Sequence, residues 1–148
     1  MSFAKIYTRA LLGLHAPSVE VEVHLSQGLP SLTIVGLPEA AVRESKDRVR
    51  SAIINSGFQF PTKRLTINPA PADLPKDSSR LDLPIALGIL IASGQLPEQG
   101  TDNFEFIGEL ALDGQLRQIS GTLSIAIACQ QARHKLILPE ANAQEASQ

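Results

Sequence analysis

Apolar and polar residues alternate along three stretches near the N-terminus. The clearest alternation covers residues 18–25, where three valines are each followed by a charged or imidazole side chain. A period of two places one face of a strand in the core and the other in water. Residues 4–14 and 31–35 show the same tendency, and a glycine- and proline-containing turn precedes the last of them. We therefore expect three strands joined as an antiparallel meander.

Three longer stretches have helical character. Residues 39–56 carry an apolar stripe on one side and charged pairs at i,i+4 spacing on the other, which we interpret as a solvated face. Residues 83–93 are apolar nearly all round, which predicts a central, buried helix, and residues 122–132 predict a third helix. The helical side chains expected to be buried are Val42, Val49, Ile53, Ile85, Leu87, Leu90, Ile125 and Ile127.

A stiff polar segment connects a short strand, predicted at residues 65–68, to the central helix. Its three prolines fix φ and lack an N–H donor, so we expect neither helix nor strand pairing within it. Polar residues near its end are expected to cap the helix, and Gly94 to end that helix. The prolines are Pro69, Pro71 and Pro75, and the expected capping residues are Asp77, Ser78 and Ser79.

The second half of the chain adds strands at residues 104–110, 116–119 and 135–138. An Asp113-Gly114 pair between the first two of these predicts a tight hairpin. Strands and helices that are interspersed in this way predict an α+β fold, with a mixed β-sheet and helices packed on it.

Length and composition limit the class of protein. A chain of 148 residues with 43% hydrophobic and 19% charged residues suits one soluble domain. The single Cys129, in an apolar helical run, argues against disulfides and a cysteine-based metal site. The sequence has no signal peptide and no apolar run long enough to span a membrane, so we expect a cytoplasmic location. The last residues lack apolar positions for packing, which predicts that residues 1–148 are a fragment of a longer protein.

The net charge is −2, but basic residues gather between positions 43 and 80, where eight Lys or Arg stand against four Asp or Glu. No Gly-x-x-x-x-Gly-Lys-Ser/Thr motif occurs, so this chain carries no P-loop. The three histidines have no ligand spacing, which argues against a metal site. Ser78 and Ser79 leave a nucleophile open, although neither lies in a Gly-x-Ser-x-Gly elbow.

Two segments resemble Lon-type ATP-dependent proteases. The sequence PKDSSR at residues 75–80, followed by an apolar helix, resembles the proline-lysine-aspartate-glycine-proline-serine stretch of that family, and residues 108–121 resemble the segment before its catalytic lysine. In this register the nucleophilic serine falls on Arg80 and the lysine on Leu123. An arginine cannot act as the nucleophile and a leucine cannot deprotonate one. The resemblance implies a Lon-protease-like (ribosomal protein domain-2-like) fold without the peptidase.

Four longer segments, residues 4–13, 21–26, 34–52 and 71–77, resemble the N-terminal domain of the ComM/YifB family, bacterial relatives of the Mg-chelatase ATPase subunit. The resemblance implies a non-catalytic Lon-like domain, fused to a C-terminal AAA+ ATPase domain that would bind ATP and Mg. It further implies a homohexamer that acts in DNA branch migration, with helicase activity, during natural transformation. The implied partners are the AAA+ domain, neighbouring subunits and DNA, with no cofactor in this chain and no membrane.

Two interpretations therefore remain open. In the first, the chain is an accessory binding or assembly domain of a DNA-remodelling ATPase. In the second, it is a divergent serine hydrolase that uses Ser78 or Ser79, although no base is evident beside either serine.

Candidate anion contacts surround the start of the central helix. Lys76 and Arg80 flank this helix N-terminus, where free N–H groups and the helix dipole favour anions. Lys63 and Arg64 would extend the site into a patch that contacts phosphate or DNA. In the alternative, Arg80 pairs with an acidic neighbour and stabilises the loop. Those neighbours are Asp73, Asp77 and Asp82.

Overall fold

The computed structural model describes residues 2–72, 78–98, 101–119, 122–132 and 134–146. Its strands are β1 (Ser2–Arg9), β2 (Ser18–Ser26), β3 (Ser31–Ile34), β4 (Arg64–Ala70), β5 (Phe104–Phe106), β6 (Glu109–Leu110), β7 (Leu116–Arg117) and β8 (Lys135–Ile137). Its helices are α1 (Glu39–Asn55), α2 (Asp82–Ala92), α3 (Thr122–Gln131) and α4 (Ala143–Ala146), with 3₁₀ turns η1 (Ser78–Leu81) and η2 (Glu140–Asn142).

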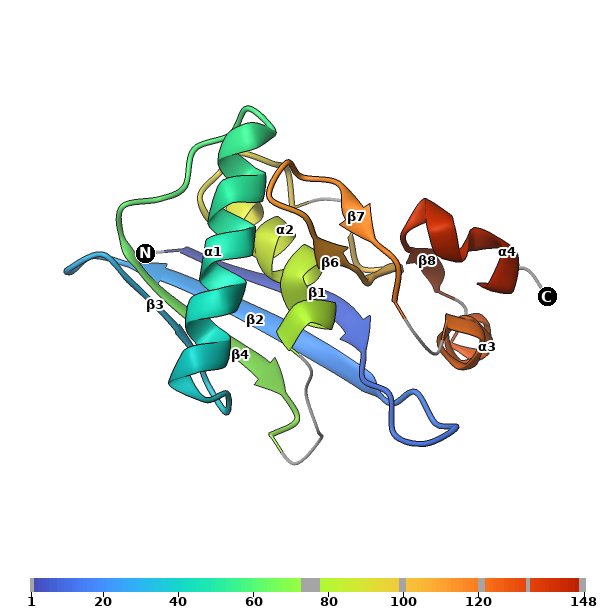
Figure 1. The fold of residues 1–148 in the computed structure, drawn as a ribbon. Helices are drawn as coiled ribbons and strands as arrows, with labels where there is room; N and C mark the ends of the chain where they lie inside the picture. Colours follow the sequence, from blue (N-terminus) through green and yellow to red (C-terminus); the bar gives the residue numbers. More distant parts are fainter. Residues whose placement is uncertain (1, 73–77, 99–100, 120–121, 133, 147–148) are drawn as a thin grey trace.

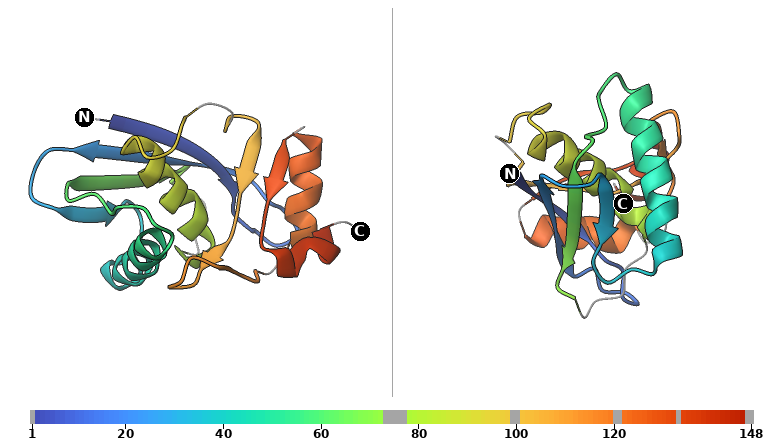
Figure 2. Two further views of the ribbon diagram at one scale, coloured as in Figure 1. Left: turned by 90° about the horizontal axis from the view of Figure 1, so that it is seen from above. Right: turned by 90° about the vertical axis from the view of Figure 1, so that its left-hand side faces the viewer.

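The main sheet is mixed, with the strand order β3-β4-β2-β1-β5-β8. Strand β2 pairs antiparallel with β1 and β4, whereas β3 is parallel to β4 and β5 is parallel to β1 and β8. Helices α1 and α2 lie on the same side of this sheet, and α3 lies beside β8 (Figures 1 and 2). The predicted α+β fold with a mixed sheet is confirmed.

The predicted meander is wrong at its third strand. Strand β4 lies between β2 and β3, and β3 runs parallel to β4 instead of returning along β2. Alternation of apolar residues identifies the buried face of a strand but carries no information on which strand becomes its neighbour. The predicted Asp113-Gly114 hairpin is confirmed between β6 and β7, because its pairing depends on local turn geometry.

The main core lies between the sheet and the two helices α1 and α2. Five of the helical side chains predicted to be buried are buried: Val49, Ile53, Ile85, Leu90 and Ile125. Val42 and Leu87 are only half-buried. The prediction for Ile127 is wrong, because this side chain is 48% exposed. Helix α3 is apolar on most sides, yet only the side that carries Ile125 packs on a cluster, a smaller one that includes Ile107 and Ile119.

Helix α2 packs closely on the sheet and confirms the prediction of a central helix. A methyl group added at Gly88 would lie 2.5 Å from Cγ2 of Val23, so only a glycine allows the helix to approach β2 this closely. Gly94 follows the helix with φ of +77°, the left-handed conformation expected after a helix end.

The entry into helix α2 differs from the prediction in two respects. Strand pairing continues through Pro69, which is opposite Val21 in β2. The carbonyl of Ile67 accepts from Val35 N on the β3 side, and a residue two positions further has the same orientation. The nitrogen of Pro69, which carries no hydrogen to donate, therefore faces the side where β3 has already ended. In addition, the N-cap position of α2 is occupied by Leu81 at the end of η1, which makes no side-chain capping hydrogen bond, and not by one of the expected residues. Of the expected caps, Asp77 lies outside the described residues.

A buried carboxylate holds the helices together. Asp82, the first residue of α2, is 0% exposed and accepts hydrogen bonds from three other parts of the chain. Arg48 of α1 donates through Nε at 2.6 Å and Nη2 at 3.2 Å, Ser45 Oγ donates at 3.1 Å, and Leu110 N of β6 donates at 3.1 Å. The contact joins α1, α2 and β6.

This contact corrects the interpretation of α1. Its charged face was expected to be solvated, but the side chain of Arg48 is only 20% exposed and binds Asp82. The exposed pair of Glu39 and Arg43 does form, at 3.7 Å. Burial raises the pKa of Asp82, and the hydrogen bonds from Arg48 and Leu110 oppose that rise. The pKa of Arg48 is raised mainly by its hydrogen bond to Asp82.

Replacing Arg48 with methionine should destabilise the fold. The substitution keeps a long side chain but removes the charged partner of a buried carboxylate. Breaking a buried ion pair in this way costs about 3–5 kcal/mol. We expect the lower end of that range, because Arg48 is 20% exposed and water screens part of the interaction. Urea unfolding at pH 7, followed by circular dichroism, measures the loss.

The loss should become smaller in acid. Without Arg48 the pKa of Asp82 rises further above that of the unfolded chain, so the folded variant binds a proton more tightly. Its stability should therefore increase as the pH falls from 7 toward the ordinary aspartate pKa of about 4, and the gap to the unmodified protein should narrow. Arg43→Met, which removes an exposed arginine, is the control and should change little. Equal losses in both variants at both pH values would contradict this role of Arg48.

Candidate functional site

The structure separates the basic residues that were expected to form one patch. Arg80 lies in η1, which packs on α1, α2 and β6, and it is only 8% exposed. Lys63 and Arg64 lie at the other end of β4, a strand about 20 Å long for its seven residues. Lys76 lies outside the described residues. Lys63 and Arg64 therefore do not extend a site at Arg80.

Of the three acidic residues that were expected to pair with Arg80, one is bound by other donors and two lie outside the described residues. Asp82 is occupied by Arg48, Ser45 and the Leu110 amide. Asp73 and Asp77 lie outside the described residues. The pairing of Arg80 with either of these two carboxylates stays a prediction.

The two positions that resemble the Lon dyad lie in different parts of the fold. Leu123 is half-buried in α3, which packs on β8 and α4, whereas Arg80 belongs to η1 beside α1 and α2. Ser79 is half-buried in η1. The carboxylate three residues after it, Asp82, is already the acceptor of Arg48 and two further donors. Asp82 is therefore not placed to serve as a base for this serine.

A second buried carboxylate lies between strands β1 and β5. Glu105 is 1% exposed and accepts hydrogen bonds from Arg9 Nε at 2.6 Å and Arg9 Nη2 at 3.0 Å. His134 Nδ1 lies 2.7 Å from the same carboxylate. Arg9 also donates to the carbonyl oxygen of Ala16 at 2.9 Å. Sequence reasoning missed this cluster, since Arg9 and Glu105 are 96 residues apart and no local motif connects them.

Cys129 adds a thiol to this cluster, so that a cysteine, a histidine and a glutamate lie together. These are residue types used in nucleophilic catalysis. However, Cys129 is 2% exposed and its Sγ donates to the backbone oxygen of His134 at 3.2 Å, not to the imidazole. Burial, with the nearby charge of Glu105, raises the pKa of the thiol to about 11. The thiol is therefore protonated at neutral pH, and the cluster joins β1, β5 and the α3–β8 turn instead of forming a nucleophile.

Slow alkylation of Cys129 would verify this assignment. A pKa of about 11 leaves far less thiolate at pH 8 than the ordinary cysteine value of about 8.5. Iodoacetamide should therefore modify the folded protein at least about a hundredfold more slowly than the urea-unfolded protein at the same pH. Intact-protein mass spectrometry measures both rates. Similar rates in the folded and unfolded proteins would contradict a buried, protonated thiol.

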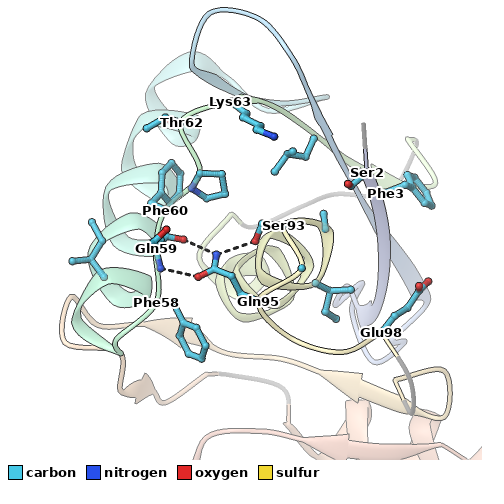
Figure 3. Close-up of a pocket in the computed structure, with 16 residues that line it drawn as sticks. Ser2, Phe3, Phe58, Gln59, Phe60, Thr62, Lys63, Ser93, Gln95 and Glu98 are labelled. Carbon is cyan, nitrogen blue, oxygen red and sulfur yellow. Dashed lines mark hydrogen bonds between the residues drawn. The ribbon is translucent and has the colours of Figure 1, made fainter.

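A surface hollow of about 950 Å³ lies where α1 and α2 end (Figure 3). Its lining mixes apolar and aromatic side chains with polar ones, and Phe3 is 52% exposed and Ile54 44% exposed. The Gln95 amide bridges the backbone of Gln59, accepting from N at 2.8 Å and donating to O at 2.7 Å, and also donates to Ser93 Oγ at 2.9 Å. These bonds fix the wall of the hollow to the end of α2. A concave surface that combines aromatic and apolar side chains with a few polar groups suits binding.

Among the described residues, no group of three or more His, Cys, Asp or Glu side chains is arranged to hold a metal ion. None of the helices in the same part of the chain is long and apolar enough to cross a membrane.

Comparison with known proteins identifies relatives along nearly the whole chain. Residues 21–142 match the family model for subunit ChlI of Mg-chelatase. The chain is 54% identical to "Competence protein ComM" of Haemophilus influenzae over 147 residues and 53% identical to "Uncharacterized protein YifB" of Escherichia coli over 145 residues. It is 38% identical to "Uncharacterized protein Rv2897c" of Mycobacterium tuberculosis over 148 residues.

These alignments cover 99%, 98% and 99% of this chain, respectively, but 29% of each relative. The chain therefore spans less than a third of the length of these relatives. The family model covers most of the described sheet and its helices, from β2 to η2. On this match, the chain belongs to the family of the Mg-chelatase ChlI subunit and, within it, to the ComM/YifB proteins.

Proposed function

We propose that this chain is a non-catalytic, Lon-like accessory domain of an ATPase that remodels DNA during natural transformation. The observation that carries the proposal is the 54% identity to a protein named for competence, together with the match to the ChlI family. Because the chain aligns with 29% of that relative, the relative has room for a separate domain, which we propose to be the ATPase. ATP and Mg would bind in that domain, and the assembly would be a homohexamer.

The chemistry of the described residues supports a binding or assembly role. The two buried carboxylates that the structure places near candidate groups, Asp82 and Glu105, both accept bonds from arginines. The buried thiol of Cys129 has a raised pKa. These groups hold elements together instead of facing a substrate. Within the proposed assembly, the domain would position DNA or neighbouring subunits while the ATPase domain supplies the mechanical work.

A comparison of two versions of the longer protein tests the proposal. The complete protein should drive ATP-dependent branch migration of a fluorescently labelled three-strand DNA junction. A version that lacks residues 1–148 should still hydrolyse ATP but migrate the junction at least about tenfold more slowly, as expected when a positioning contact is lost. Native mass spectrometry of both versions separates a loss of DNA positioning from a loss of hexamer assembly. Unchanged junction migration by the shortened hexamer would contradict an accessory role.

The hydrolase alternative has its own control. A serine-reactive fluorophosphonate should not label the 148-residue chain above the level of a Ser78→Ala, Ser79→Ala double variant. Labelling that disappears in the double variant, with folding intact, would instead favour the hydrolase.

A further inference from the structure

Three basic side chains from two separate segments line one small pocket at the edge of the sheet. The pocket, of about 150 Å³, lies between α1, the start of β3 and the loop before β4. Lys46 and Arg50 line it from α1, and Lys63, which also lines the larger hollow, lines it from the loop. The hydroxyl-bearing residues Ser31 and Thr62 complete the polar part of the lining. The remaining lining residues are Pro30, Phe60 and Pro61.

The positions of the three bases follow from the secondary structure. Lys46 and Arg50 are four residues apart and therefore share one face of α1. The loop that carries Lys63 is held in place from both sides. Ser31 N donates to Lys63 O at 3.3 Å, and the Gln95 amide fixes the same loop at Gln59 (Figure 3). The backbone thus holds the bases around the pocket without a local sequence motif.

The charge of this pocket is not neutralised within the described part of the chain. Its lining contains three bases and no Asp or Glu. The salt bridges of the described residues involve Lys5, Arg9, Arg43, Arg48 and His134, and therefore none of the three. By contrast, Arg48 of the same helix is held by Asp82 and Arg43 pairs with Glu39. Like charges brought together without a counterion repel each other, which favours an oxyanion ligand.

Arg64 differs from Lys63 although it is the next residue. It does not line the pocket, and its Cβ and Cδ lie within 3.8 Å of the position that a Cβ would take at Gly28, in the turn after β2. Successive residues of an extended chain point to opposite sides, so two adjacent bases serve different surfaces. Arg64 is therefore a matched control for Lys63.

We infer that Lys46, Arg50 and Lys63 form a binding site for a phosphate group, and that in this protein the phosphate belongs to the backbone of DNA. The inference deepens the proposed function and rests on it for the choice of DNA. Lysine and arginine are the side chains that neutralise phosphates, and contacts of this kind position DNA without reading its sequence. Arg50 is exposed and Lys46 and Lys63 are half-buried, so the three side chains can be reached from solvent.

Charge-removing variants of the 148-residue chain test the site. The Lys46→Gln, Arg50→Gln double variant removes two of the three bases. Binding of a fluorescein-labelled thymidine 30-mer is followed by anisotropy across a salt series. If both bases contact phosphates, the slope of log Kd against log salt should fall by about 1.4, since each contact to a single strand contributes about 0.7. Lys63→Gln alone should reduce the slope by about 0.7.

The control removes the same number of charges elsewhere. The Arg43→Gln, Arg64→Gln double variant alters one exposed residue of α1 and one of β4, neither of which lines the pocket. Its slope should stay close to that of the unmodified chain. Thermal unfolding confirms that all variants are folded. Equal changes in the two double variants, or no change in either, would overturn the site.

A second arm identifies the source of the phosphate. Inorganic phosphate and the thymidine 30-mer are titrated separately into ¹⁵N-labelled chain, and the amide shifts around Lys46, Arg50 and Lys63 are followed. Tighter binding of the 30-mer at the same amides supports the DNA backbone. Saturation by inorganic phosphate without tighter binding of the 30-mer overturns the DNA assignment and leaves a site for free phosphate.

The outcomes for the site and for the proposed function can be distinguished. The accessory function is judged by junction migration of the longer protein with and without residues 1–148. If that difference persists but the pocket variants bind DNA normally, the pocket assignment is wrong and the accessory function stands. If the pocket variants lose DNA binding while the shortened protein migrates junctions normally, the site stands and the accessory function is wrong.

Discussion

The arrangement of the helices depends on one buried ion pair. Asp82 begins α2 with no exposed surface, and it is tolerated there because Arg48, Ser45 and the Leu110 amide satisfy its oxygens. A carboxylate in this position fixes α1 against α2 and brings β6 to the start of the same helix. Apolar packing is non-directional, whereas a buried charge must be placed opposite its partner because it is costly to bury alone. The pair therefore sets the register of the layer that covers the sheet.

The second buried carboxylate, Glu105, is stabilised in the same way, by charged hydrogen-bond donors. Glu105 is held by Arg9 and His134, so strands β1 and β5 are joined by charge as well as by backbone pairing. Side chains of types that occur in catalytic sites therefore have a structural role here, including the thiol of Cys129 with its raised pKa. Among the bases of α1, by contrast, Lys46 and Arg50 face a pocket without acidic residues. This division between charges that stabilise the fold and charges that remain available supports the proposed binding role.

This division fits membership of the ComM/YifB proteins. The chain covers 29% of the relatives described above, and beside the proposed ATPase domain it would contribute by holding a substrate or a neighbouring subunit. Contacts with a phosphate backbone need only positive charge in a fixed place, because they are independent of base sequence. Such contacts would suit the proposed DNA-remodelling assembly, which would act along DNA of any sequence. In this view the domain needs rigid placement of three bases, and the loop held by Gln95 supplies part of that rigidity.

The sequence by itself determined the α+β class, the strand β2, the central helix α2 and the hairpin at Asp113-Gly114, because these depend on periodicity and on local turn chemistry. It also contained the family resemblance. Tertiary structure alone decided that β4 separates β2 from β3 and that Arg48 binds the buried Asp82. It also decided that Lys63 lines a pocket together with residues of α1, whereas Arg64 does not. Each of these depends on segments far apart in the chain, whose meeting is set by the packing of the whole core and leaves no local pattern.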